Sequence, residues 1–115
     1  MHKDVNEFLR DAKAKVRSCH RRFIPRNDRD MLQDFIDLGI SKREDAWRII
    51  LQLSASDESQ PNDLDKDGSG KRVWFFRRMM ENGVYAYIKL KIDERGCVCI
   101  SFHPVEYGEY ANQDH

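Results

Sequence analysis

The chain has 115 residues and a mass of 13.7 kDa, which is the size of one ordinary domain. Its 20 basic and 20 acidic side chains cancel, so the net charge provides no overall attraction to nucleic acid or membrane. No apolar run approaches the roughly 18 residues of a membrane span, the first residues are charged, and only three cysteines are present. We expect one cytoplasmic domain over residues 1–115, with reduced cysteines.

The charges are unevenly distributed along the chain. Residues 10–26 contain seven basic side chains and one acidic one, and residues 71–95 contain seven and three. Residues 51–70 contain five acidic side chains and one lysine, and residues 104–115 form an acidic tail without Lys or Arg. Basic blocks on a neutral chain suit phosphate binding, although a run of charge on a helix is commonly only a solvated face.

The chain begins with a predicted amphipathic helix over residues 4–17. Its apolar stripe has helical spacing and consists of Val5, Phe8, Leu9, Ala12 and Val16. Residues 20–24 then predict a short extended segment that ends at Pro25.

Two further helices are expected before the middle of the chain. One spans residues 28–38 and is stopped by Gly39, which can adopt the left-handed conformation. The other begins at Ser41, whose hydroxyl can form a capping box with Glu44, and it contributes Trp47 to the core.

Residues 54–70 are poor in apolar side chains, and we expect them to form a long, flexible, acidic loop. Within it, Asp63, Asp65 and Asp67 resemble the opening of a calcium-binding loop. The twelfth position of that motif is Trp74, where a bidentate glutamate is required. The acidic groups are therefore expected to meet a basic neighbour, with a calcium-responsive regulator as the alternative.

The second half predicts an antiparallel meander of three strands. The strands cover residues 72–79, 84–92 and 97–103, and turns at Asn82-Gly83 and Arg95-Gly96 connect them. The expected fold class is α+β, with the N-terminal helices packed on one face of an antiparallel sheet that ends in this meander.

Alternation along these strands assigns side chains to two faces of the sheet. In the second strand, the face toward the helices takes Ala86, Ile88, Leu90 and Ile92. The opposite face takes Tyr85, Tyr87, Lys89 and Lys91. In the third strand, the same alternation places Val98, Ile100 and Phe102 toward the helices and Cys97, Cys99, Ser101 and His103 on the opposite face.

Four side chains on the polar face could support RNA cleavage: Tyr87, Lys89, Ser101 and His103. Cross-strand neighbours lie within about 5 Å of each other. Cleavage without a metal needs a base for the 2′-hydroxyl, a cation for the phosphate and an acid for the leaving oxygen. His103 can serve as acid or base, Lys89 can stabilise phosphate charge, and Tyr87 can hydrogen-bond or stack on a base. The simpler interpretation is a solvated polar sheet face.

The candidate catalytic residues are therefore His103, Lys89 and Tyr87. The candidate RNA- or phosphate-binding residues are Arg77, Arg78, Lys91, Tyr85 and Ser101. No metal site is expected, because the two-cysteine pattern at Cys97 and Cys99 lacks zinc-ligand spacing.

Several segments, taken in order, resemble the MqsR family of bacterial toxins. They are Leu53-Ser54-Ala55-Ser56-Asp57, the following Asp/Gly loop, Val73-Trp74-Phe75-Phe76, Tyr87-Ile88-Lys89-Leu90-Lys91 and Cys99-Ile100-Ser101-Phe102-His103. The similarity covers about residues 38–103 and depends on order and spacing rather than on one diagnostic motif.

The resemblance implies a RelE-like fold and the toxin of a type II toxin–antitoxin system. Such a toxin is an mRNA interferase: a metal-independent endoribonuclease that cleaves single-stranded mRNA, needs no cofactor, arrests growth and is silenced by a cognate antitoxin. The family's catalytic tyrosine falls on Tyr87, and His103 stands where the best-known members have lysine. Another active-site lysine of the family would fall near Gln60, and a glutamine that follows the tryptophan would fall on Phe75. Because this chain lacks both residues, His103 and Lys89 would have to transfer the protons and stabilise the charge. The alternative is a non-catalytic RNA- or protein-binding module that uses the same basic face.

Overall fold

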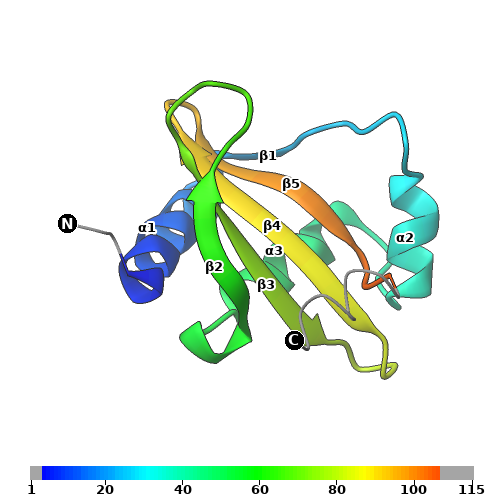
Figure 1. Ribbon diagram of the computed structural model, residues 1–115. Helices are drawn as coiled ribbons and strands as arrows, with labels where there is room; N and C mark the ends of the chain where they lie inside the picture. Colours follow the sequence, from blue (N-terminus) through cyan, green and yellow to red (C-terminus); the bar gives the residue numbers. More distant parts are fainter. Residues whose placement is uncertain (1–3, 107–115) are drawn as a thin grey trace.

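The computed structural model describes residues 4–106, which form an α+β fold of helices and one five-stranded sheet (Figure 1). In chain order the elements are α1 (Val5–Arg17), β1 (Arg21–Phe23), α2 (Met31–Asp37), α3 (Arg43–Leu51), the 3-10 turn η1 (Ala55–Asp57), β2 (Glu58–Leu64), β3 (Arg72–Met79), β4 (Tyr85–Asp93) and β5 (Gly96–Pro104). None of the helices within these residues is long and apolar enough to cross a membrane. The predicted tail falls mostly on residues 107–115, outside the described residues.

The sheet has the strand order β1-β5-β4-β3-β2. Strands β3, β4 and β5 form the predicted antiparallel meander, and β2 adds a further antiparallel strand at one edge. Strand β1 pairs with β5 in parallel, with Arg21 opposite Cys97, so the sheet is mixed rather than wholly antiparallel as expected. The parallel strand is the extended segment predicted before Pro25, and its partner could not be inferred from local sequence.

One glycine makes the junction between β1 and β5 possible. Gly96 has φ +123°, and a Cβ atom there would lie 2.1 Å from the carbonyl oxygen of His20. The next residue, Cys97, donates its backbone N–H to that same carbonyl at 2.9 Å. Because the two backbones approach so closely, only a residue without a side chain fits at this turn.

The hydrophobic core lies between the helices and one face of the sheet. The buried stripe of α1 is the predicted one, and its Phe8 ring stacks on Trp74 of β3 with ring centroids 4.7 Å apart. Trp47 of α3 packs against Phe23 of β1 at 4.5 Å. Both tryptophans are therefore core residues. The opposite face of the sheet does not carry this core.

Two predicted helix starts are wrong, although both helices exist. Helix α2 begins at Met31 because the Asp30 carboxylate accepts the backbone N–H of Gln33 at 3.2 Å and caps it. At α3, the Ser41 hydroxyl donates to Asp45 at 3.0 Å, so the capping box with Glu44 does not form. The predicted stop at Gly39 is confirmed by its φ of +77°.

Residues 54–70 are not one continuous loop. Residues 58–64 form β2, which pairs with β3 through two register shifts. Pro61 is tolerated because an edge strand needs hydrogen bonds on one side only. The acidic side chains that remain in the connection, Asp65 and Asp67, belong to the turn at residues 65–71 between β2 and β3.

A β-bulge in β5 changes which side chains share a face. Lys89 is opposite Ser101 and Leu90 is opposite Cys99, so Ile100 is the extra residue. Cys97 and Cys99 therefore lie in the core, where burial raises the pKa of Cys97 to about 12. The prediction that both cysteines share a face with Ser101 and His103 is wrong, since alternation is interrupted between them.

Candidate functional site

Tyr87 and His103 are directly opposite each other on β4 and β5, on the sheet face opposite the one that carries the core residues Ile88 and Phe102. Their ring centroids are 5.3 Å apart and the rings are tilted by 40°. Lys89 and Ser101 form the next cross-strand pair on the same face. The structure thus brings together the four side chains that the sequence grouped.

Arg77 joins this group from β3. It is the cross-strand partner of Tyr87, and its guanidinium lies 5.2 Å from the ring centroid of Tyr85. The ammonium group of Lys89 lies 5.7 Å from the ring centroid of Phe75, its cross-strand partner on β3. Two cations therefore lie beside the Tyr87–His103 pair, each against an aromatic ring.

Arg78, which was predicted to bind phosphate together with Arg77, lies on the opposite face of the sheet from Tyr87. Its cross-strand partner is the fully buried Ala86, and its guanidinium donates to Asp57 at 3.2 Å and to the Gln52 side chain at 3.2 Å. Consecutive residues of a strand point to opposite faces, so only one of the two arginines could join the group.

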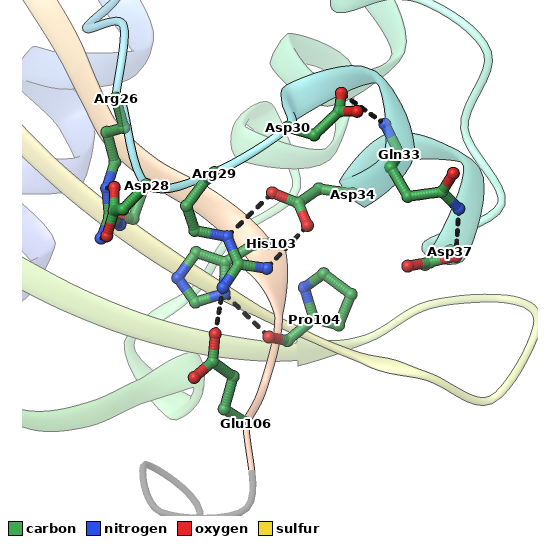
Figure 2. Close-up of polar contacts among 11 residues, drawn as sticks. Arg26, Asp28, Arg29, Asp30, Gln33, Asp34, Asp37, His103, Pro104 and Glu106 are labelled. Carbon is green, nitrogen blue, oxygen red and sulfur yellow. Dashed lines mark hydrogen bonds and ion pairs between the residues drawn. The ribbon is translucent and has the colours of Figure 1, made fainter.

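His103 is almost fully buried, with 2% of its surface exposed. Its Nδ1 lies 2.8 Å from the carbonyl oxygen of Pro104 (Figure 2). A carbonyl oxygen only accepts hydrogen bonds, so Nδ1 carries the proton, and in the neutral ring Nε2 carries the lone pair. In this tautomer Nε2, rather than Nδ1, is the ring nitrogen able to accept a proton.

Lys91 was predicted to bind phosphate, and in the structure its ammonium group binds two carboxylates. Its ammonium group donates to Asp65 at 2.6 Å and to Asp67 at 3.0 Å, and only 6% of the residue is exposed. The hydrogen bond to Asp65 is the main cause of its raised pKa. The expectation that the acidic side chains meet a basic neighbour is confirmed. No group of three or more potential metal-ligating side chains occurs within residues 4–106.

Three of the seven basic side chains in the first basic block, residues 10–26, form ion pairs within residues 4–106, and two of these lie on β1. Arg21 pairs with Glu44, and Arg22 pairs with Asp93. These arginines fasten β1 to α3 and β4, so this part of the predicted positive surface is structural.

Sequence reasoning missed two arginines beside β5. Arg26 donates to the hydroxyl of Ser101 at 2.8 Å and forms a two-point contact with Asp28. Arg29 binds Asp34 on α2 through two nitrogens and also binds Glu106 (Figure 2). Both arginines lie in the irregular segment before α2, where no helical or strand periodicity predicts which way a side chain points.

A cavity of about 180 Å³ lies between this segment and β5. Its walls include Phe23, Met31 and Phe102, and its polar lining includes Arg26, Arg29, Ser101 and His103. His103 is thus both the partner of Tyr87 across the sheet and a lining residue of the cavity.

Comparison with known proteins adds no assignment to this geometry. The chain matches no known protein family, and no curated protein sequence is significantly similar to it.

Proposed function

We propose that this protein is a metal-independent endoribonuclease that cleaves single-stranded mRNA, acting as the toxin of a type II toxin–antitoxin system. The observation that carries the proposal is the cross-strand group: Tyr87 opposite His103, with Lys89 and Arg77 on the same face. A group that can act as base or acid and two cations for the phosphate lie in one place, as RNA cleavage by 2′-hydroxyl attack requires, and the aromatic ring beside them can stack on a base.

In the proposed reaction, His103 Nε2 takes the proton of a ribose 2′-hydroxyl. The 2′ oxygen then attacks the adjacent phosphorus, and the bond from phosphorus to the 5′ oxygen breaks. Lys89 and Arg77 stabilise the added negative charge on the phosphate oxygens. The leaving 5′ oxygen receives its proton from the His103 imidazolium or the Lys89 ammonium group. The products are a 2′,3′-cyclic phosphate and a 5′-hydroxyl.

The biological role rests on the resemblance to the MqsR toxins. The segments that carry it include Tyr87-Ile88-Lys89 and Ser101-Phe102-His103, the same segments that form the cross-strand group. The proposal includes a cognate antitoxin protein as partner, a RelE-like fold and a cytoplasmic site of action. A helix-turn-helix gene next to the coding sequence would support this role.

The direct test is cleavage of labelled single-stranded RNA in the presence of EDTA, with analysis of the new ends. We expect wild-type protein to produce 2′,3′-cyclic phosphates. His103→Gln and Lys89→Met should each reduce the rate about 100- to 10,000-fold. The matched control is Lys71→Met. It removes a basic side chain that lies outside this group and forms an ion pair with Glu94 at 3.0 Å.

Circular dichroism and thermal melting establish that each variant is folded. Because His103 is buried, its variant could be unstable, and the partly exposed Lys89 then decides the question. Wild-type protein that makes no new ends, or both variants cleaving like wild type, would overturn the proposal.

One observation favours a second function. The almost complete burial of His103 would suit a structural imidazole in a non-catalytic RNA-binding module. In that case RNA is retained on a gel without new ends, Lys89→Met weakens retention, and His103→Gln leaves it unchanged.

A further inference from the structure

We propose that the cavity beside β5 binds one unpaired nucleobase of the RNA, next to the linkage that is cleaved. The inference rests on the proposed function, because it assigns a base-recognition pocket to the same site. It concerns the space between β5 and residues 24–31, which the cross-strand group does not occupy.

The cavity exists because β1 is much shorter than its partner. Strand β1 pairs with residues 97–99 only, and Ile24 makes one further contact to the carbonyl of Cys99 at 3.1 Å. After Pro25 the chain turns away, so the outer edge of β5 from Ile100 onward has no strand beside it within the described residues. A strand edge offers backbone donors and acceptors, which can bind the polar edge of a base.

The size and lining fit one aromatic ring system. An engineered apolar cavity of about 150 Å³ holds benzene, whereas pockets for drug-sized ligands begin at about 300 Å³. At about 180 Å³, this cavity accepts a single base rather than a dinucleotide. Phe23, Met31 and Phe102 supply the apolar walls that a planar ring needs.

The charges favour a neutral ring over a phosphate. The guanidinium of Arg26 is paired with Asp28, and that of Arg29 is paired with Asp34 and Glu106. The cavity therefore has no surplus positive charge to attract a phosphate. The Arg26 plane is held by Asp28 and Ser101 at once, and a fixed guanidinium plane is a surface on which bases stack.

His103 fixes the place of the base relative to the chemistry. It lines the cavity and is also the cross-strand partner of Tyr87. A base seated in the cavity therefore belongs to a nucleotide adjoining the reacting ribose, and the pocket would select the cleavage sequence at that position.

The test uses uncharged ribonucleosides, so that phosphate contacts play no part. Cytidine, uridine, adenosine and guanosine are titrated into the purified protein, with free ribose as the control without a base. Methyl NMR signals of Met31, Ile24 and Ile100 report binding. We expect at least one nucleoside to shift these signals in the millimolar range, and ribose to leave them unchanged.

Met31→Trp should fill the cavity and weaken nucleoside binding at least tenfold, reported by Ile24 and Ile100. Its matched control is Leu32→Trp on the same helix, where the side chain is 68% exposed and the cavity is untouched. If Met31→Trp does not fold, Arg26→Met, which removes the guanidinium plane, replaces it with the same expected loss. The inference fails if no nucleoside shifts the signals, if ribose shifts them equally, or if the folded cavity variant binds like wild type.

The two proposals are separable by result. Nucleoside binding in a protein that cleaves no RNA retains the pocket and ends the ribonuclease proposal. RNA cleavage without nucleoside binding retains the ribonuclease proposal and ends the pocket proposal. If both hold, sequencing the cleaved ends should show that Met31→Trp changes the preferred nucleotide at one position beside the cut, while Leu32→Trp retains the wild-type preference.

Discussion

The ammonium group of Lys91 lies 2.6 Å from a carboxylate oxygen of Asp65, which ties the turn between β2 and β3 to the middle of the sheet. Asp67 accepts a second hydrogen bond from Lys91 at 3.0 Å. Hydrogen bonds from the side chain and then the backbone N–H of Ser69, together with the one from Lys91, hold the pKa of Asp67 well below its usual range. Lys91 and Lys89 are two residues apart on one strand face, yet only Lys89 lies beside the Tyr87–His103 pair.

The two lysines should therefore behave differently when replaced by methionine. Lys91→Met loses charge-assisted hydrogen bonds and should lower the free energy of unfolding by about 2 kcal/mol, as measured by urea denaturation. It should leave the salt dependence of RNA binding unchanged. Lys89→Met should reduce the slope of log affinity against log salt by about 0.7, the value for one phosphate contact on a single strand. The reverse pattern would show that Lys91 leaves the acidic turn to contact RNA.

Gly96 should be the least replaceable glycine among those described. In Gly96→Ala the new methyl group collides with the His20 backbone, and the positive φ adds strain of about 1–2 kcal/mol. Gly68→Ala is the matched control, because its φ is +81° and nothing lies within 4 Å of the added Cβ. Urea denaturation should show a clearly larger loss for Gly96→Ala. Equal losses would mean that β1 can shift away from β5 at little cost.

The Arg22–Asp93 pair should contribute to acid stability. Arg22 is the main reason that the pKa of Asp93 falls to about 2. Because the folded state has the lower pKa, the stabilisation is present above the unfolded value of about 3.9 and is lost as the pH falls through about 2.

Urea midpoints at pH 5 and pH 2.5 measure this effect. Asp93→Asn should be less stable than wild type at pH 5, and the difference should shrink at pH 2.5. Glu81→Gln, at an exposed position, is the charge-matched control. A difference that persists unchanged at pH 2.5 would assign the loss to packing rather than to the ion pair.

Local patterns predicted most of the elements. The stripe of α1, the Asn82-Gly83 turn and the strands of the meander follow from periodicity and turn residues that act over a few positions. Strand β2 escaped prediction because its sequence has low β propensity, and pairing with β3 overrides that preference.

The candidate site was predicted in part, since Tyr87 and His103 do share a face. Their shared face does not depend on the bulge at Ile100, which reverses the faces predicted for the residues before it, Cys97, Val98 and Cys99. A bulge is set by the fit between strands and has no signature in the alternation itself. The contacts of Arg26 and Arg29 are likewise long-range, because they depend on where the chain runs after β1.

The parallel pairing of β1 with β5 has a consequence for synthesis. Residue 21 pairs with residue 97, so 76 positions separate the partners. At roughly 5–20 residues per second, β1 waits about 4–15 s for its partner to be translated. The sheet edge that bears the proposed base pocket is therefore completed only after residues 97–99 have left the exit tunnel.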